Sequence, residues 1–253
     1  MSPSRISRHV IKLGGASLFS SEPSIQLFEG YFRECETRAP FQRTSSQHFV
    51  IVGGGDTVES MRTIHRLHPK LDLREMHWRC VDLLDTTWDI ATTLFPSLKP
   101  ITDRNELDQI LASGEQGWYL VRVTSYYHRS QLEWIPEHFL PRENWDTTTD
   151  ALAWLLAYKV HALELELIKK PVHEFDQSFD DAASQGLIDP EISRFAKADS
   201  PRVPFASFLT AYDINKKRWT RCQLRRQKPD HASDSVAIGY RGLGNPVYEG
   251  NNP

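Results

Sequence analysis

The sequence predicts an α/β fold, a three-layer α/β/α sandwich with a mainly parallel central sheet. Residues 9–13 and 48–52 are short apolar runs without the polar alternation of a half-exposed strand, so each is expected to be a buried strand. Both runs end in glycines, and a segment with helical spacing of apolar residues follows each. Buried strands that alternate with helices are typical of a parallel sheet covered on both faces.

The other elements follow from periodicity and turn residues. Helices are expected, in chain order, at 24–33, 56–67, 73–95, 103–112, 148–159, 179–185 and 190–197. Strands are expected around Ile101 and at 118–123 and 162–168, and a hairpin at 205–214 and 218–224. Residues 38–47 read as a polar connector, and 126–146 as an irregular loop rich in aromatic residues and prolines.

Helix starts are marked by capping residues. Asp56 is expected to be an N-cap, with Glu59 three residues later completing a capping-box pattern. Asp103 is expected to cap the helix at 103–112. Thr148 or Thr149 would cap the helix that follows, with Asp150 in its first turn, and capping alone would explain these residue types.

The length of 253 residues fits one or two domains. We expect one main domain over residues 1–226. Residues 227–253 carry Gly, Asn and Pro without a periodic apolar face, which predicts a poorly packed tail.

Composition excludes several classes of protein. The 30 basic and 33 acidic residues give a net charge of −3, which argues against a chain that coats nucleic acid or an anionic membrane. No apolar run approaches the roughly 18–20 residues of a membrane-spanning helix, and the start of the chain lacks the apolar core of a secretory signal. Cys35, Cys80 and Cys222 form no CxxC pair, so a reducing cytoplasm fits best.

Two glycine segments at the ends of predicted strands are candidate phosphate-binding loops. Because both follow buried strands, we expect Lys12–Ser17 and Gly53–Asp56 to face the same cleft. In Lys12–Ser17 (KLGGAS), glycines let backbone N–H groups approach a phosphate and the lysine supplies charge. In Gly53–Asp56, three consecutive glycines precede a helix N-terminus, which favours an anion. A turn with a solvated lysine and a flexible glycine loop would explain the same residues. Neither segment is GxxxxGK[ST] or GxGxxG, which argues against a Walker-type or nicotinamide dinucleotide site.

Together with the later TTTDALAWLLA, these segments resemble the amino acid kinase superfamily in order and spacing over residues 8–200. That superfamily includes acetylglutamate, aspartate, uridylate, carbamate and isopentenyl phosphate kinases. Two features, Trp145 to Asp150 before a strand ending in Lys169 and the segment 186–190, resemble the branch of the archaeal methanofuran-pathway kinase. That kinase phosphorylates an aminomethylfuran-methyl phosphate.

The resemblance implies a small-molecule kinase that uses ATP and Mg²⁺ and forms a homodimer or higher homo-oligomer. Its acceptor would carry a carboxylate, phosphate or hydroxyl group, and a phosphorylated aminomethylfuran in C1-carrier cofactor biosynthesis is a candidate. Lys12 would contact the transferred phosphoryl group, and Asp150 would orient Lys12 and a second basic residue. The nucleotide would bind at Gly14, Gly15, Ser17, Thr148 and Thr149. The acceptor would bind at Gly53, Gly54, Gly55 and Asp56.

The sequence departs from the superfamily pattern in two places. The usual second catalytic lysine after a GGM-type motif is absent; Lys169, Lys170 and Lys197 are candidates to replace it, and we favour Lys169. Residues 169–174 (KKPVHE) replace the usual TDVDG-like nucleotide segment. These departures leave open an alternative function, a weak or inactive nucleotide- or oxyanion-binding protein on the same fold.

Two further clusters are set aside. His65, His68 and His77 lack a carboxylate or cysteine to complete a ligand set, so we expect no metal ion held by protein side chains. A basic run at 216–228 surrounds Trp219, and it is interpreted as a solvated hairpin and tail instead of a nucleic-acid contact, because the whole chain is slightly acidic.

Overall fold

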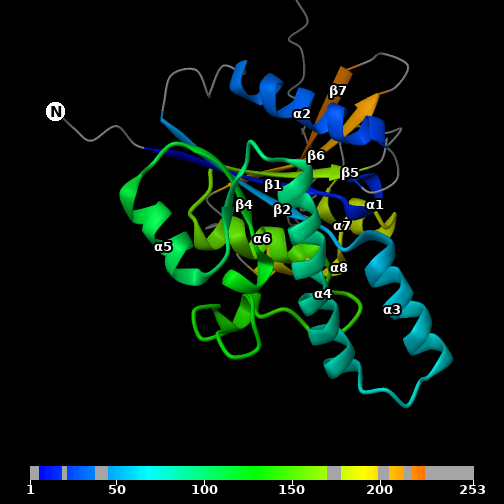
Figure 1. The fold of residues 1–253 in the computed structure, drawn as a ribbon. Helices are drawn as coiled ribbons and strands as arrows, with labels where there is room; N and C mark the ends of the chain where they lie inside the picture. The colour runs from blue at the N-terminus through cyan, green and yellow to red at the C-terminus, as the bar shows by residue number, and fades with distance from the viewer. Residues whose placement is uncertain are drawn as a thin grey trace, which may run out of the picture.

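The computed structural model describes residues 6–18, 22–37, 45–169, 178–198, 205–213 and 218–225. Within them, one sheet has the strand order β3-β4-β2-β1-β5-β6-β7 (Figure 1). The strands are β1 Ser7–Leu13, β2 Ser46–Val52, β3 Lys99–Ile101, β4 Gly117–Val121, β5 Glu164–Lys169, β6 Ala206–Asp213 and β7 Arg218–Leu224. Neighbouring strands pair in parallel except β6 and β7, which form the expected antiparallel hairpin.

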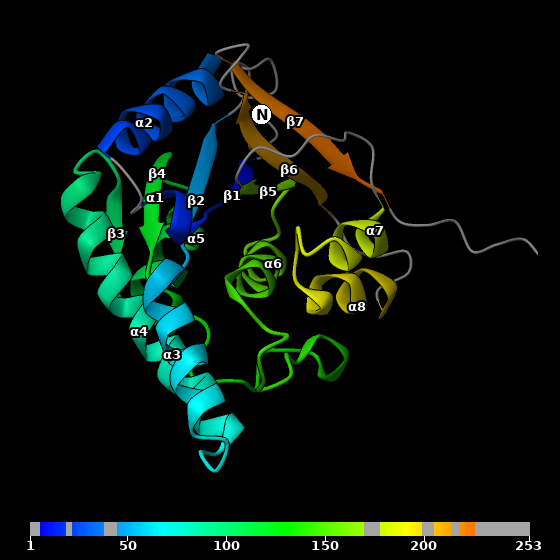
Figure 2. The same ribbon diagram turned by 90° about the vertical axis from the view of Figure 1, so that its right-hand side faces the viewer.

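Helices cover both faces of this sheet, which confirms the predicted three layers. The helices are α1 Gly15–Leu18, α2 Glu22–Thr37, α3 Gly55–Leu67, α4 Leu73–Leu94, α5 Arg104–Ser113, α6 Thr149–Lys159, α7 Phe179–Ser184 and α8 Pro190–Ala198, with short 3₁₀ turns at Val123–Ser125 and Glu137–Phe139. Helix α2 lies on one side of the sheet, and α6, α7 and α8 lie on the other (Figure 2).

Two hydrophobic clusters fill the space between the layers. Successive strand residues point to opposite faces, so Val10 joins the cluster under α6 and α8, while Ile11 joins the cluster under α2. Helix α4 contributes to both: Trp78 packs in the first cluster and Trp88 in the second. Helix α4 therefore packs in both clusters and contacts the strands β2 and β4.

Helix α3 is the least embedded helix of the described fold. None of its described side chains is buried, and it packs mainly along α4 (Figures 1 and 2). Ile64 and Leu67 on α3 and Leu73 at the start of α4 are large apolar side chains that remain exposed. The α3–α4 hairpin thus projects from the body of the molecule.

Most predicted elements are present, but two local predictions are wrong. Helix α3 begins at Gly55, and its N-cap is Gly54 with no side-chain hydrogen bond, so Asp56 is not the cap. The reason is geometric: the glycine backbone turns directly from β2 into the helix. The strand expected at 118–123 ends at Val121, and Val123 starts a 3₁₀ turn. Asp103 caps α5 as predicted. The tail predicted at 227–253 lies outside the described residues.

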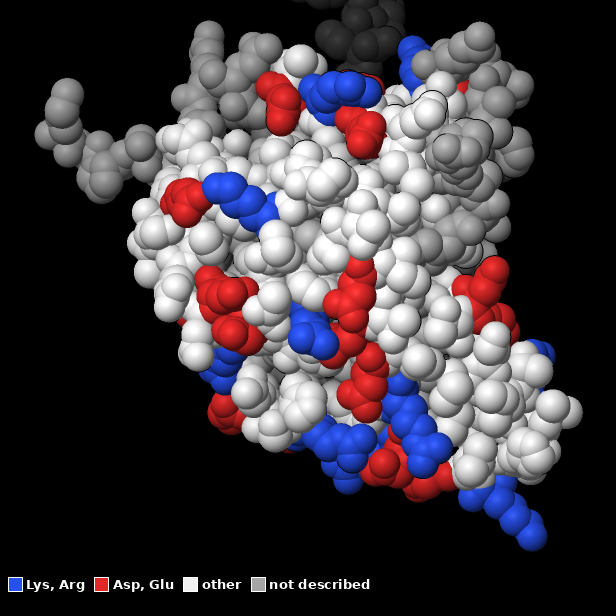
Figure 3. Space-filling view, viewed as in Figure 1, with Lys and Arg blue, Asp and Glu red and all other residues white. Residues whose placement is uncertain are grey.

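Charges on the face drawn in Figure 3 are mixed, with acidic and basic side chains interspersed. In the described part of the basic run, Arg221 forms ion pairs with Glu164 and Glu166. No helix within the described ranges has the length and apolar character needed to cross a membrane.

A stacked histidine predicts pH-dependent stability. The rings of His48 and Trp118 stack with centroids 4.1 Å apart, and His9 stacks on His48 at 5.2 Å. Burial, followed by the nearby His9, lowers the pKa of His48 to about 3. An unfolded chain binds a proton at His48 below its ordinary pKa of 6.5, so His48 stabilises the fold above pH 6.5 and this contribution is lost as pH falls.

Acidification from pH 7 to pH 5 should therefore remove about 2 kcal/mol of stability through His48 alone. Urea unfolding at pH 7, 6 and 5 measures it. In His48→Gln the loss should be smaller by that amount, while His68→Gln, at an exposed position after α3, should keep the wild-type dependence. Identical pH dependence in wild type and His48→Gln would contradict the prediction.

Candidate functional site

The two glycine segments meet at the carboxyl ends of β1 and β2. These strands pair in parallel with Leu13 opposite Val52, and the Gly53 N–H donates to the Leu13 carbonyl at 2.9 Å. A Cβ atom on Gly15 would lie 2.2 Å from the Gly53 oxygen and 2.4 Å from the Gly55 nitrogen. The loops are thus in backbone contact, and glycine is required where they touch.

Gly15→Ala should separate the loops. The added methyl group meets backbone atoms that cannot rotate away, so we expect a loss of about 1–3 kcal/mol of stability. Gly30 in α2 is the matched control, because a Cβ there would meet nothing within 4 Å. Gly30→Ala should raise helix stability by up to about 1 kcal/mol. Chemical denaturation of both variants measures the contrast, and equal stabilities would contradict it.

A buried carboxylate joins two lysines beside these loops. Lys12 on β1 places its Nζ 2.8 Å from Oδ1 of Asp150, and Lys169 at the end of β5 bonds Oδ2 of the same carboxylate. The side chains of Lys12 and Asp150 are 8% and 2% exposed, whereas that of Lys169 is 21% exposed. The sequence separates these residues widely, and parallel pairing of β1 with β5 brings the lysines together.

The charges of this cluster hold Asp150 ionised. Burial alone would raise the pKa of Asp150, but Lys12 and then Lys169 outweigh burial and lower it to about 2. Burial lowers the pKa of Lys12, and Asp150 opposes that effect. The carboxylate therefore acts as a fixed anion between two cations, not as a group that takes up protons near neutral pH.

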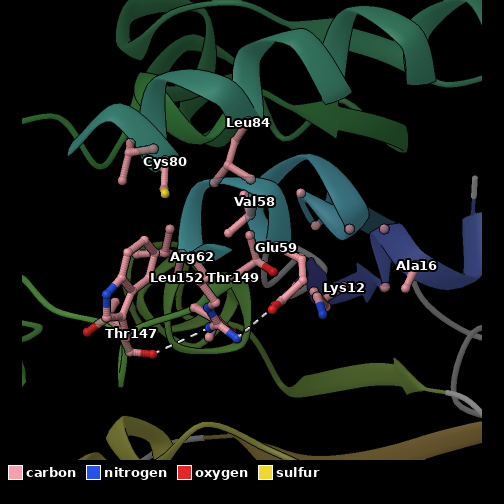
Figure 4. Close-up of a pocket in the computed structure, with 18 of the residues that line it drawn as sticks. Lys12, Ala16, Val58, Glu59, Arg62, Cys80, Leu84, Thr147, Thr149 and Leu152 are labelled. Carbon is pink, nitrogen blue, oxygen red and sulfur yellow. Dashed lines mark hydrogen bonds and ion pairs between the residues drawn. The ribbon is translucent and has the colours of Figure 1, made fainter. Parts of the chain in front are cut away.

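Both lysines and both glycine loops line one cavity of about 420 Å³ (Figure 4). The loop residues on its wall are Gly14, Gly15, Ala16, Gly53, Gly54 and Gly55. The start of α6 contributes Thr148 and Thr149. The prediction that the two glycine segments face one cleft is therefore confirmed.

One wall of this cavity is apolar. In Figure 4, Val58 from α3, Leu84 from α4 and Leu152 from α6 lie around the same space, and Cys80 lies next to them. Burial raises the pKa of the Cys80 thiol to about 11, so the thiol stays protonated at neutral pH. This wall can hold an apolar molecular body and offers no nucleophile of its own.

The cavity also carries a pair of opposite charges away from Asp150. Arg62 lies 3.5 Å from Glu59, donates at 3.5 Å to the Trp145 carbonyl, and places its guanidinium 5.6 Å from the Trp145 ring centroid (Figure 4). Trp145 is fixed in turn by its Nε1–H, which donates to His65 Nδ1 at 3.1 Å. This wall therefore offers a cation and an anion to a bound molecule.

Several predicted site residues lie elsewhere. Asp56 is exposed and does not line the cavity. Lys197 is an exposed partner of Asp180 and does not line the cavity. Ser17 lies in α1, but its side chain is outside the description, as is Lys170. Of the three candidates for the second lysine, Lys169 is the one that bonds Asp150 within the described residues.

The sequence patterns assigned no individual role to two residues of this region. From the sequence, Arg62 resembles any surface residue of a helix. In the structure it lies over the Trp145 ring and lines the cavity. Asp189 belongs to the segment 186–190, which is noted above only for its resemblance to one kinase branch, yet it is 4% exposed and bonds the start of α6.

The donor set of the cavity fits a bound triphosphate. Two ammonium groups and the backbone of two side-chain-free loops surround the space, and a Cβ at Gly53 would come within 2.9 Å of Thr149 Oγ1. Among the described residues, no cluster of three His, Cys, Asp or Glu side chains could hold a metal ion by itself.

No protein-family model and no curated protein sequence matches the chain. Solved structures share its fold. A UMP kinase from Ureaplasma parvum has a TM-score of 0.53 at 12% identity, over 87% of this chain and 99% of that one. A uridylate kinase from Archaeoglobus fulgidus has 0.51 at 15% identity, over 86% and 91%. An aspartate kinase from Synechocystis has 0.56 at 13% identity, over 88% of this chain and 40% of that one.

These neighbours are amino acid kinase family members, and at such identities the likeness establishes the fold. The expected fold class is confirmed: a mainly parallel sheet of the amino acid kinase type between two helical layers.

Proposed function

We propose that the chain is a phosphotransferase that moves the γ-phosphoryl group of ATP to a small-molecule acceptor. The observation that carries this proposal is the pair of lysines, Lys12 and Lys169, which line one cavity and share the carboxylate of Asp150. Phosphoryl transfer has a loose transition state with charge spread over the phosphoryl oxygens, so it needs positioning and positive charge more than a base.

Each part of the site has a role in this reaction. Bound ATP would supply the phosphoryl group, and its Mg²⁺ would supply positive charge toward the phosphates. Lys12 and Lys169 neutralise the negative charge of the transferred group, and Asp150 holds both ammonium groups in place. The Gly14–Gly15 backbone faces the nucleotide phosphates, with Thr148 and Thr149 beside it, and Gly53–Gly55 holds the acceptor.

The acceptor end of the cavity favours a molecule with an apolar body. The wall of Val58, Leu84 and Leu152 would bury such a body, while its carboxylate, phosphate or hydroxyl group faces the lysines. A phosphorylated aminomethylfuran meets these requirements: its ring suits the apolar wall, and its ammonium group would find a carboxylate in Glu59.

We further propose a homodimer or higher homo-oligomer in the cytoplasm. The exposed apolar side chains of Ile64, Leu67 and Leu73 on the α3–α4 hairpin would be covered by a second copy. The three cysteines of the sequence form no CxxC pair, in keeping with a reducing compartment. Sedimentation at several protein concentrations tests the oligomeric state; a monomer throughout would refute it.

Isotope-labelled ATP tests the function. The protein is incubated with γ-labelled ATP, Mg²⁺ and a metabolite extract, then with single acceptors that include UMP, aspartate and an aminomethylfuran phosphate. Label transfer by wild type and not by Lys12→Met supports the proposal. Saturable ATP binding without transfer to any acceptor would instead identify a nucleotide-binding protein without catalysis.

A further inference from the structure

Asp189 is a buried carboxylate that stands immediately before α8. Oδ2 accepts from the backbone N–H of Thr148 at 2.8 Å and from that of Ala151 at 2.9 Å, while Oδ1 accepts from the Thr148 hydroxyl at 2.5 Å. Asp189 therefore satisfies donors of the first turn of α6 from a segment some forty residues later.

The residue held between these two contacts is Asp150. The local cap of α6 is weak, since the Asp150 N–H lies 3.3 Å from Thr148 Oγ1. The bonds from Asp189 to Thr148 and Ala151 are shorter and bracket Asp150 on both sides in the chain. They fix the backbone that aims the Asp150 carboxylate at Lys12 and Lys169.

The charges agree with such a coupling. Two cations, Lys12 and Lys169, face two anions, Asp150 and Asp189, in one buried group. Burial raises the pKa of Asp189 to about 6, with the negative charge of Asp150 as the next cause and Lys169 opposing it. Asp189 in turn raises the pKa of Lys12. A change at Asp189 is thus felt at the lysine by electrostatics as well as through the backbone.

We propose that Asp189 is a positioning residue for phosphoryl transfer, which sets the orientation of Asp150 and through it that of the two lysines. This inference rests on the proposed phosphotransferase function. The segment that carries Asp189 also lines the cavity with Gly186 and Leu187, so it contacts the same space as the lysines.

Asp189→Asn is the principal test, because it keeps the shape of the side chain, removes its negative charge and turns one of its acceptor atoms into a donor. We expect kcat to fall about 10- to 100-fold, as a small misplacement of reacting groups does, with the KM for ATP changed less than about 3-fold. Asp103→Asn is the matched control: Asp103 caps α5 in the same chemical way, at an exposed place outside the cavity, and should leave kcat unchanged.

The pH profile separates positioning from a purely structural role. Wild-type kcat should fall as the pH drops below about 6, where Asp189 gains a proton, and this limb should be missing from Asp189→Asn. Thr148→Val, which removes the hydroxyl donor and keeps the backbone bond, serves if Asp189→Asn does not fold. A wild-type kcat and pH profile in a folded Asp189→Asn variant would overturn the proposal.

A measurement on the nucleotide-free protein keeps the test independent of activity. Titration of ¹³C-labelled lysine by NMR follows Lys12, whose pKa should fall in Asp189→Asn because an anion that raised it is gone. If no acceptor is ever phosphorylated, the proposed function fails, but the titration still tests whether Asp189 acts on Lys12. An unchanged Lys12 pKa in Asp189→Asn would show that it does not.

Discussion

Replacing Lys12 with methionine is expected to lower kcat about 10²- to 10³-fold, the loss typical of one charged contact to a transition state. Methionine keeps much of the buried stem of Lys12 and removes its charge. Because the ammonium group neutralises charge that develops during transfer, the KM for ATP should change much less than kcat. Steady-state release of ADP, measured with an acceptor that the wild-type protein phosphorylates, gives both constants.

Lys169→Met should act in the same direction, since Lys169 bonds the other oxygen of Asp150. Lys99→Met is the matched control, because Lys99 pairs with Glu115 on an exposed edge of the sheet. Wild-type kcat in Lys12→Met, with the fold intact, would leave the amino acid kinase fold standing and remove the proposed mechanism.

Short-range patterns explain why so much of the fold was predictable. The strand at 48–52 has no exposed position, so its apolar composition marks it, whereas the strand at 162–168 is predicted despite Glu164 and Glu166. The shared cleft of the two glycine loops follows from parallel pairing, because neighbouring parallel strands end at the same edge of a sheet. Neither inference needs a distance between side chains.

Contacts between distant segments were not predictable in the same way. Asp189 reaches Thr148 only because α8 packs beside α6, and no local pattern encodes that contact. Arg62 joins the cavity because Trp145, from the irregular loop, covers it. Asp56 shows the converse: a good capping residue loses the cap position to Gly54 because the chain enters α3 directly from the glycine turn.

The contact of Lys12 and Lys169 with one carboxylate was predictable only in part. The resemblance to amino acid kinases implied that Asp150 orients Lys12 and a second cation, and Lys169 was the favoured choice among three. The described fold places Lys169 there because β5 ends beside β1. Its catalytic role is still a proposal that mutation must test.

Asp150→Asn is expected to slow turnover by about 10²-fold, because an amide cannot hold two ammonium groups. Asparagine matches aspartate in shape, and Thr148 provides the N-cap of α6, so loss of a helix cap cannot explain a large effect. Unfolding curves should confirm that the variant is folded. An active Asp150→Asn enzyme would mean that the lysines reach their positions without the carboxylate.

The double variant Lys12→Met/Asp150→Asn tests whether Lys12 and Asp150 contribute to turnover together or independently. Independent effects would multiply, giving a loss of about 10⁴- to 10⁵-fold, whereas residues in direct contact depart from additivity. With Nζ and Oδ1 2.8 Å apart, we expect the double variant to lose little more than Lys12→Met alone, about 10³-fold. The control cycle pairs Lys12→Met with Asp103→Asn, which should be additive because Asp103 caps the distant α5. Additive losses in the first cycle would show that Asp150 contributes to turnover by a route other than holding Lys12.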